Sequence, residues 1–215
     1  IVFGDWSSDV CSSDLIYNKS KTLYGIFFAR NAIVAADNCM LVEGYTDVIS
    51  LHQAGIENVV ASSGTSLTID QIRMIKRYTS NITILYDGDP AGIKASFRGI
   101  DMIVEQDIAV KIVLFPDGED PDSFARKHHP SEVSDFLKQN AVNFILFKTR
   151  LLLGETQGDP IKKAALIREI VSTIALISDS ISRSLYLKEC SAIMEIREQV
   201  LIDEMNKILL KKRKK

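Results

Sequence analysis

The sequence has few cysteines and no excess of either charge. Its 215 residues include three cysteines, Cys11, Cys39 and Cys190, which lie far apart and form no CxxC pair. This spacing excludes a disulfide framework and a structural zinc site. The formal net charge of −2 gives no bulk signal for nucleic-acid binding, so any such function has to be found in local motifs.

Long apolar runs are missing as well. No run approaches the roughly 18 residues that a membrane-spanning helix requires. Hydrophobic residues make up 46% of the chain and charged residues 25%, which is enough to build a globular core. We therefore expect a cytoplasmic protein with no membrane partner.

The first fifteen residues differ from the rest of the chain. They consist of IVFGDWSSDVCSSDL, in which Ser-Ser-Asp occurs twice and no helical or strand periodicity is present. Residues 1–15 are similar to translated sequencing-adapter read-through, and we expect that they are not native protein. The amphipathic pattern of residues 16–38 predicts a helical lead-in to the first strand.

Between residues 39 and 130 short apolar runs alternate with amphipathic segments. The pattern predicts strands at 39–43, 58–62, 81–86 and 109–115, and helices at 47–54, 68–78, 90–105 and 122–128. This alternation predicts an α/β domain with a parallel sheet and helices on both faces. Strand signals then stop, and we expect an all-helical subdomain over 131–210 and a basic tail over 211–215.

Acidic residues follow three of the predicted strands. Glu43 follows the first, Asp87 and Asp89 follow the third, and Asp120 and Asp122 follow the fourth. Ligands of parallel sheets bind beyond the carboxyl ends of the strands, and carboxylates there suit Mg²⁺ or Mn²⁺. A single Asp-Gly motif is most often a turn. Three acidic strand ends in one domain instead predict a metal site that acts on phosphates, with two ions.

Four motifs resemble a known family. EGYTDV, ASSGTSLT, LYDGDPAG and FPDGEDPDSFARK occur in the order found in the Toprim catalytic core of bacterial replicative (DnaG-type) DNA primases. The resemblance covers about residues 16–153. It implies that Glu43, Asp87 and Asp89 bind the catalytic Mg²⁺ ions and that Asp120 and Asp122 complete the acidic site.

The same resemblance assigns two basic residues. Lys19 matches a family lysine in a basic strip that contacts the template or the nucleotide. Arg98, on the helix after DGD, matches a family arginine, although a solvated helix face is an alternative role for it.

The implied activity is that of a nucleotidyltransferase. A DNA primase is a DNA-directed RNA polymerase that makes short RNA primers from ribonucleoside triphosphates on single-stranded DNA during replication. The family's zinc-binding domain and the basic N-terminal half of its polymerase domain have no counterpart here. We therefore expect a fragment with two Mg²⁺ or Mn²⁺ ions and no zinc, whose replicative helicase partner binds a C-terminal domain absent from this chain.

Two other classes remain open. A Toprim-type nuclease or topoisomerase-like enzyme would break phosphodiester bonds, and a topoisomerase would also need a tyrosine on a separate domain. A non-catalytic Toprim binding module would keep its partners after loss of Asp87 and Asp89. The order of the four motifs favours the primase.

Overall fold

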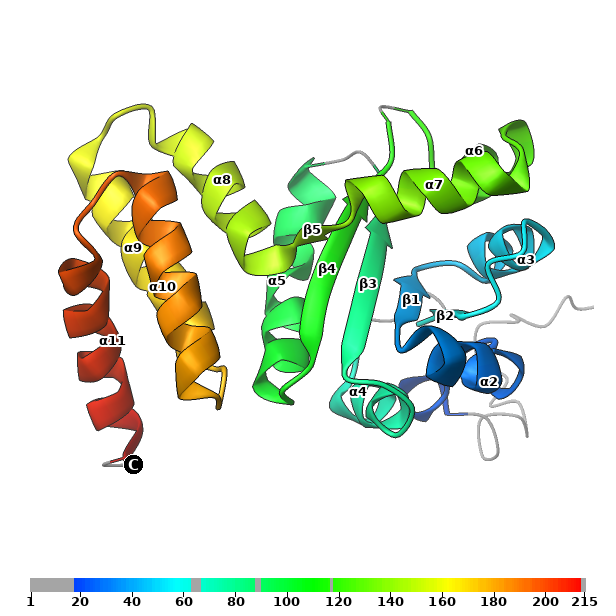
Figure 1. Ribbon diagram of the computed structural model, residues 1–215, viewed down its shortest axis with the longest axis horizontal. Coiled ribbons are helices and arrows are strands. Elements are labelled where there is room, and N and C mark those ends of the chain that lie inside the picture. Colours follow the sequence, from blue (N-terminus) through cyan, green and yellow to red (C-terminus); the bar gives the residue numbers. More distant parts are fainter. Residues whose placement is uncertain (1–17, 63–66, 88–89, 117, 214–215) are drawn as a thin grey trace, which may run out of the picture.

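The computed structural model describes residues 18–62, 67–87, 90–116 and 118–213. Figure 1 shows an α/β unit, built around a sheet, beside a unit of helices that contains the C-terminal part of the chain. The segment 1–15 lies outside the described residues. None of the described helices is long and apolar enough to cross a membrane.

The sheet has the strand order β2-β1-β3-β4-β5. Four strands are parallel, as predicted, and they are β1 (Cys39–Val42), β2 (Val59–Ala61), β3 (Asn81–Tyr86) and β4 (Ala109–Leu114). A fifth strand, β5 (Val142–Asn143), pairs antiparallel with β4 and was not expected. Its two residues are too few to produce a periodic signal, and they are defined by pairing with Lys111 and Ile112.

Helices cover both faces of this sheet. Six of them belong to the α/β unit, namely η1 (Lys19–Lys21), α2 (Ile26–Ala36), α3 (Tyr45–Gln53), α4 (Ile69–Lys76), α5 (Pro90–Glu105) and α6 (Pro121–Lys127), and α7 (Pro130–Asn140) follows them. Alternate residues of β3 point into separate cores, since Ile82 and Ile84 pack with α4 and α5 whereas Leu85 packs with α3, α6 and α7. The predicted two-faced arrangement is therefore confirmed.

The remaining helices form the second unit. They are α8 (Phe144–Thr156), α9 (Pro160–Ile174), α10 (Ser180–Met194) and α11 (Glu198–Arg213). Asp159 and Asp179 cap the starts of α9 and α10 by accepting hydrogen bonds from backbone N–H groups of the first turn. Helix α11 continues through Arg213, so the predicted basic tail is helical up to that residue.

A buried lysine joins the two units. Lys148 of α8 is 1% exposed, and its ammonium donates a 3.0 Å hydrogen bond to Thr173 Oγ1 of α9. Its Nζ lies 3.6 Å from Asp101 Oδ2 of α5 and 3.2 Å from Glu169 Oε1 of α9. It also lies 4.9 Å from the centre of the Phe97 ring. One side chain therefore holds α5, α8 and α9 together by charge, hydrogen bonding and cation–π contact.

Replacing Lys148 tests this joint. Lys148→Ala is expected to lower the free energy of unfolding by about 2–4 kcal/mol, because it leaves a cavity and removes the cation from two carboxylates. Lys148→Met keeps most of the volume and should cost less, since the side chains of Asp101 and Glu169 are 32% and 48% exposed and can be solvated. Urea unfolding of both variants measures the difference, and an equal loss would contradict a role for side-chain volume.

Candidate metal centre at the carboxyl edge of the sheet

The predicted acids lie at one edge of the sheet because the parallel strands end at the same level. Leu41 of β1 lies opposite Ile84 of β3, and Tyr86 lies opposite Leu114 of β4. Glu43 comes directly after β1 and Asp87 directly after β3. The structure thus places these two acids on neighbouring strand ends, as the sequence predicted. Asp89 lies outside the described residues.

Asp47 is an acid of this edge that the sequence analysis missed. It lies in the first turn of α3, and its Oδ2 accepts a 3.0 Å hydrogen bond from the backbone N–H of Gly44. Burial raises the pKa of Asp47, and the negative charges of Asp120, Asp87 and Asp122 raise it further against the lowering effect of the Gly44 bond. The available signal was its position in EGYTDV, four residues after Glu43 and at the start of the helix predicted over 47–54.

Asp120 and Asp122 both have partners within the fold. Asp120 caps α6, where its Oδ1 accepts a 2.6 Å hydrogen bond from Ser123 N, and this bond holds the pKa of Asp120 below its usual range. Asp122 Oδ1 lies 2.9 Å from Arg126 Nε and also accepts a hydrogen bond from the hydroxyl of Ser50 on α3. These contacts attach α6 to α3 and fix the direction of both carboxylates.

The donor chemistry of this edge fits a divalent cation, although the ligands are not gathered around one point. Within the described ranges, no three His, Cys, Asp or Glu side chains are close enough together to hold a metal ion. Burial is the main cause of the raised pKa of Asp47, and the charges of Asp120, Asp87 and Asp122 add to it. Hard carboxylate oxygens under mutual repulsion are the donors that Mg²⁺ and Mn²⁺ prefer.

A cavity of about 470 Å³ opens beside Glu43. Arg98 of α5 lines the same cavity, and it also lines another opening beside Asp101 and Lys148. Tyr86 and Ser96 line the cavity beside Glu43 too, and burial raises the pKa of Tyr86 to about 12 despite a hydrogen bond with Ser96. Lys19, the other predicted basic residue, is not among the residues that line it and instead lies on η1 beside α4.

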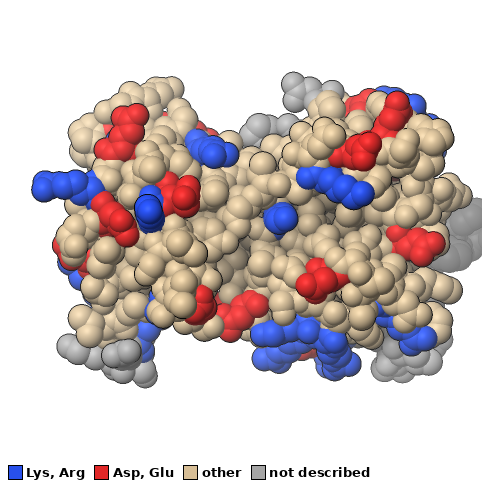
Figure 2. Space-filling model, viewed as in Figure 1, with Lys and Arg blue, Asp and Glu red and all other residues tan. Residues whose placement is uncertain are grey.

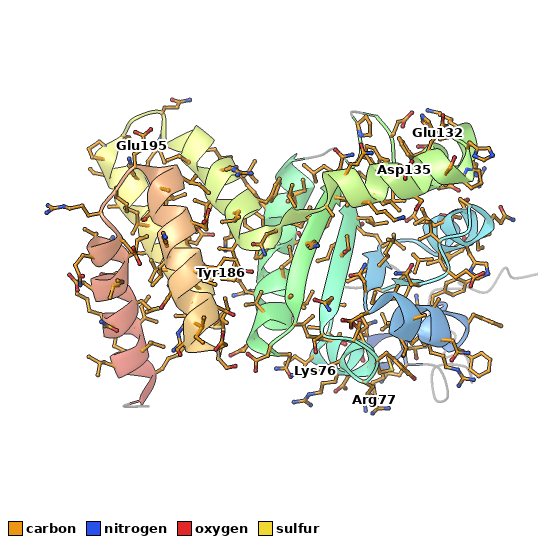
Figure 3. The ribbon with its side chains drawn as sticks, in the orientation of Figure 1. Lys76, Arg77, Glu132, Asp135, Tyr186 and Glu195 are labelled. Atoms are coloured by element: carbon orange, nitrogen blue, oxygen red, sulfur yellow. The ribbon has the colours of Figure 1, made fainter. Side chains whose placement is uncertain are left out.

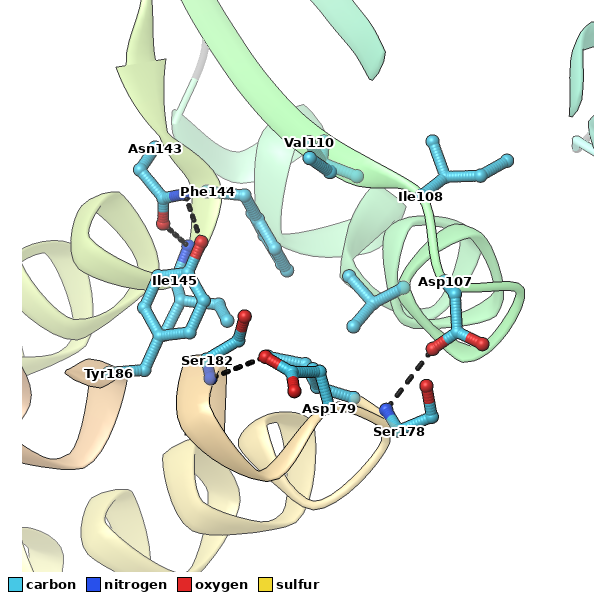
Figure 4. A pocket seen from close by; sticks show the side chains of 13 residues that line it. Asp107, Ile108, Val110, Asn143, Phe144, Ile145, Ser178, Asp179, Ser182 and Tyr186 are labelled. Carbon is cyan, nitrogen blue, oxygen red and sulfur yellow. Dashed lines mark hydrogen bonds between the residues drawn. The ribbon is translucent and has the colours of Figure 1, made fainter. Parts of the chain in front are cut away.

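A second cavity, of about 210 Å³, lies at the joint between the units rather than at this edge. Figure 4 shows its polar groups bonded to one another. Asn143 Nδ2 donates to Tyr186 Oη at 2.7 Å, and the backbone N–H of Ser178 donates to Asp107 Oδ1 at 3.1 Å. Because these polar groups already have hydrogen-bond partners, we interpret the cavity as part of the packing between the two units and not as a ligand site.

Two family models match the chain. One is described as Toprim-like and matches residues 40–125, and the other is described as the DnaB-helicase binding domain of primase and matches residues 150–199. The expectation that a helicase-binding domain is absent from this chain is therefore wrong. The error arose because the helices after residue 150 carry no short motif and are visible in the sequence only as apolar periodicity.

Relatives and solved structures to which the chain is similar agree with both family models. The DNA primase of Clostridium acetobutylicum is 40% identical over 189 residues, which are 87% of this chain and 31% of that protein. A DNA primase domain from Pseudomonas aeruginosa has a TM-score of 0.76 at 29% identity, over 89% of this chain and 61% of that one. A structure of the DnaG primase catalytic domain bound to ssDNA has a TM-score of 0.73 at 30% identity, over 82% of this chain and 58% of that one.

The alignments include both units. Residues 18–143 are less than two thirds of the chain, so an alignment over 82% of it has to include part of the α8–α11 unit. The chain spans about a third of the length of the curated relatives that it matches. On these matches, the chain belongs to the bacterial DnaG-type DNA primase family.

Proposed function

We propose that this chain forms the metal-dependent core of a DNA primase, which joins ribonucleotides into short RNA primers on single-stranded DNA. The observation that carries the proposal is the row of acids at the ends of parallel strands, beside a cavity that Glu43 and Arg98 both line. A similar protein, the DnaG primase catalytic domain, has been solved bound to ssDNA. The predicted division into a Toprim domain over 39–130 and a helical subdomain over 131–210 is part of the same proposal, with α7 and β5 of the second segment packed on the sheet of the first.

In this proposal Glu43, Asp87 and Asp89 hold two Mg²⁺ or Mn²⁺ ions, and Asp47, Asp120 and Asp122 add negative charge around them. The bound ions supply a lowered pKa for the attacking hydroxyl and neutralise charge on the phosphates. The primer 3′-hydroxyl attacks the α-phosphorus of a ribonucleoside triphosphate, and pyrophosphate leaves.

In this proposal Arg98 and the cavity bind the incoming nucleotide. Arg98 is exposed and lines the same cavity as Glu43, so its guanidinium is available there to bind phosphate oxygens. A fixed cation there would orient the leaving pyrophosphate without taking part in proton transfer.

The helical unit is proposed to bind a DnaB-type helicase. The match over residues 150–199 supports this partner, and α10 presents a suitable face. Ile181 and Leu185, one helical turn apart, are 70% and 60% exposed. Exposed apolar side chains on one helix face are typical of a protein-binding surface.

Removing two acids tests the metal centre. Asp87→Ala/Asp89→Ala should bind Mn²⁺ roughly tenfold more weakly or worse, because two carboxylate ligands are lost. Electron paramagnetic resonance on this chain measures free Mn²⁺ directly. The matched control is Asp135→Ala/Asp203→Ala, which removes two acids from α7 and α11 and should bind as the parent does.

The same pair of variants separates the alternative functions in the full-length primase. Primer synthesis from ribonucleoside triphosphates should disappear with Asp87 and Asp89 and persist in the control. Metal-dependent cutting of DNA in the absence of nucleotides would instead favour a nuclease. Unchanged Mn²⁺ binding by the double variant would mean that these acids are turn residues.

Asp47→Asn tests whether burial and the charges of the neighbouring carboxylates destabilise an ionised Asp47. Since the folded-state pKa of Asp47 is raised, its contribution to stability is present below the unfolded pKa and is lost as the pH rises through the folded pKa. At pH 7 in EDTA the variant should therefore be more stable than the parent, while keeping an oxygen for the Gly44 N–H. The difference should shrink as the pH falls to about 4.

Urea unfolding at both pH values measures this effect, and Mn²⁺ binding by the same variant should weaken. A variant that is less stable than the parent at pH 7 would show that the Asp47 carboxylate is not repelled by its neighbours.

Ile181→Asp/Leu185→Asp tests the helicase surface. Binding to a DnaB-type helicase should weaken about tenfold or more, since two exposed apolar contacts become charged. The control is Phe28→Asp/Val34→Asp on α2, whose residues are 77% and 58% exposed. Biolayer interferometry measures both, and equal weakening by the two pairs would contradict a specific surface on α10.

A further inference from the structure

A tyrosine side chain is buried directly beside the candidate ligand Asp87. Tyr86 is the last residue of β3 and is 8% exposed. Its backbone carbonyl accepts a 3.1 Å hydrogen bond from Phe115 N, which fixes the strand end against the chain that follows β4. A buried tyrosine hydroxyl usually finds a hydrogen-bond partner. The partner of Tyr86 therefore shows what its hydroxyl holds in place.

That partner is Ser96, in the second turn of α5. Ser96 Oγ donates its only proton to the carbonyl of Ile93 at 2.6 Å. The neutral Tyr86 hydroxyl is therefore the donor in the bond between the two side chains, since Ser96 Oγ keeps lone pairs that can accept it. One hydroxyl–hydroxyl bond thus connects the end of β3 to α5.

This bond spans the connection in which Asp87 lies. β3 ends at Tyr86 and α5 begins at Pro90, so only three residues join the two elements. A metal ligand has to be held within about 0.5 Å of its working position by the groups around it. A short connection whose two ends are fixed to each other meets that requirement better than one whose ends can separate.

The same tyrosine lies on the face of the sheet that carries Glu43. Leu41 lies opposite Ile84 on the neighbouring strand. Glu43 and Tyr86 each follow two residues later, so they fall opposite each other and on the same face. Both line the cavity of about 470 Å³. Burial, and to a smaller extent the charge of Glu43, raises the pKa of Tyr86, so the two side chains are within electrostatic range.

Asp87 acts on the other face. After burial, the charges of nearby acids including Asp87 raise the pKa of Asp47, which belongs to α3. Successive residues of a strand point to opposite faces, and α3 packs on the face opposite to that of Tyr86. Glu43 and Asp87 thus approach the acidic edge from two sides, and the position of Tyr86 between them sets their separation.

The other end of β3 provides a comparison for this arrangement. Figure 3 labels Lys76 and Arg77 there, and Figure 2 shows Lys and Arg side chains along this lower edge of the α/β unit. Tyr78 follows Arg77 directly and is partly buried against the same core as Tyr86. The six residues of β3 span about 20 Å. Tyr78 is therefore a tyrosine of the same core that lies far from the acids.

We propose that Tyr86 is a positioning residue for the candidate metal centre and that its hydroxyl acts through the bond to Ser96. The bond holds the end of β3 against α5, so that Glu43 and Asp87 keep the separation that divalent cations require. This inference rests on the proposed function, because it takes the acidic edge to be a metal centre. Tyr86 itself contacts neither the metal nor the substrate in this role.

Mn²⁺ binding by this chain, measured by electron paramagnetic resonance, tests the proposal. Tyr86→Phe removes only the hydroxyl and should weaken Mn²⁺ binding about tenfold, the lower end of the loss expected when the outer contacts of metal ligands are removed. Ser96→Ala removes the other partner and should weaken it by a similar factor. The matched control, Tyr78→Phe, loses a hydroxyl at the far end of β3 and should bind as the parent does.

The double variant Tyr86→Phe/Ser96→Ala separates a shared bond from two unrelated losses. If both side chains act through one bond, the Mn²⁺ affinity of the double variant should equal that of either single variant. Ser96→Thr keeps the hydroxyl and should retain the affinity of the parent chain. Losses that multiply in the double variant would overturn the proposal.

Circular dichroism melting checks that each variant is folded, and Ser96→Ala, whose side chain is only partly buried, carries the test if Tyr86→Phe unfolds. Parent-like Mn²⁺ binding by Tyr86→Phe and Ser96→Ala would overturn the positioning role. Loss of binding by Asp87→Ala/Asp89→Ala in the same experiment would then leave the metal centre itself intact. A parent chain that binds no Mn²⁺ would overturn both.

Discussion

The buried ammonium of Lys148 is the constraint on which the arrangement of the two units depends. A charge removed from water is costly unless it is fully paired, and here its partners come from two other helices, α5 and α9. Burial raises the pKa of Asp101, and the neighbouring Lys148 charge and a hydrogen bond from Thr173 offset part of that rise. Separating the helices would break all of these contacts to the ammonium at once.

Helix α5 connects the contacts of Lys148 to the candidate metal centre. It starts at Pro90, directly after the DGD motif, and contains Arg98 beside the cavity and Asp101 at the joint. Its 16 residues span about 24 Å. The acidic edge and the helical unit are therefore attached to opposite parts of one rigid element.

Local patterns allowed much of the fold to be predicted. The bounds of β3 and α5 were predicted correctly, because a continuous apolar run and a proline at the first helical position are strong local signals. The helix predicted from Thr68 does begin there, with Thr68 and Gln71 forming a capping box, but the second use of Gln71, as an anchor for η1, could not be predicted. That contact joins residues 52 positions apart, and no local pattern encodes such a distance.

The site was only partly predictable for the same reason. Glu43 and Asp87 were predicted as candidate ligands because each directly follows a strand, whereas Asp47 lies at the same edge through the packing of α3 beside α6. The pairing of Asp122 with Ser50 and Arg126 likewise depends on two helices meeting. Lys148 has the sequence character of a surface residue, and only its surroundings make it a core residue.

The short strand β5 has a mechanical consequence. Asn143 is its last residue and also the N-cap of α8, where its Oδ1 accepts a 3.0 Å bond from Ile145 N. The same side chain donates to Tyr186 of α10. Asn143 thus connects the sheet directly to α8 and α10, with no linker between them. A force applied to α10 would therefore be transmitted to the hydrogen bonds between β5 and β4.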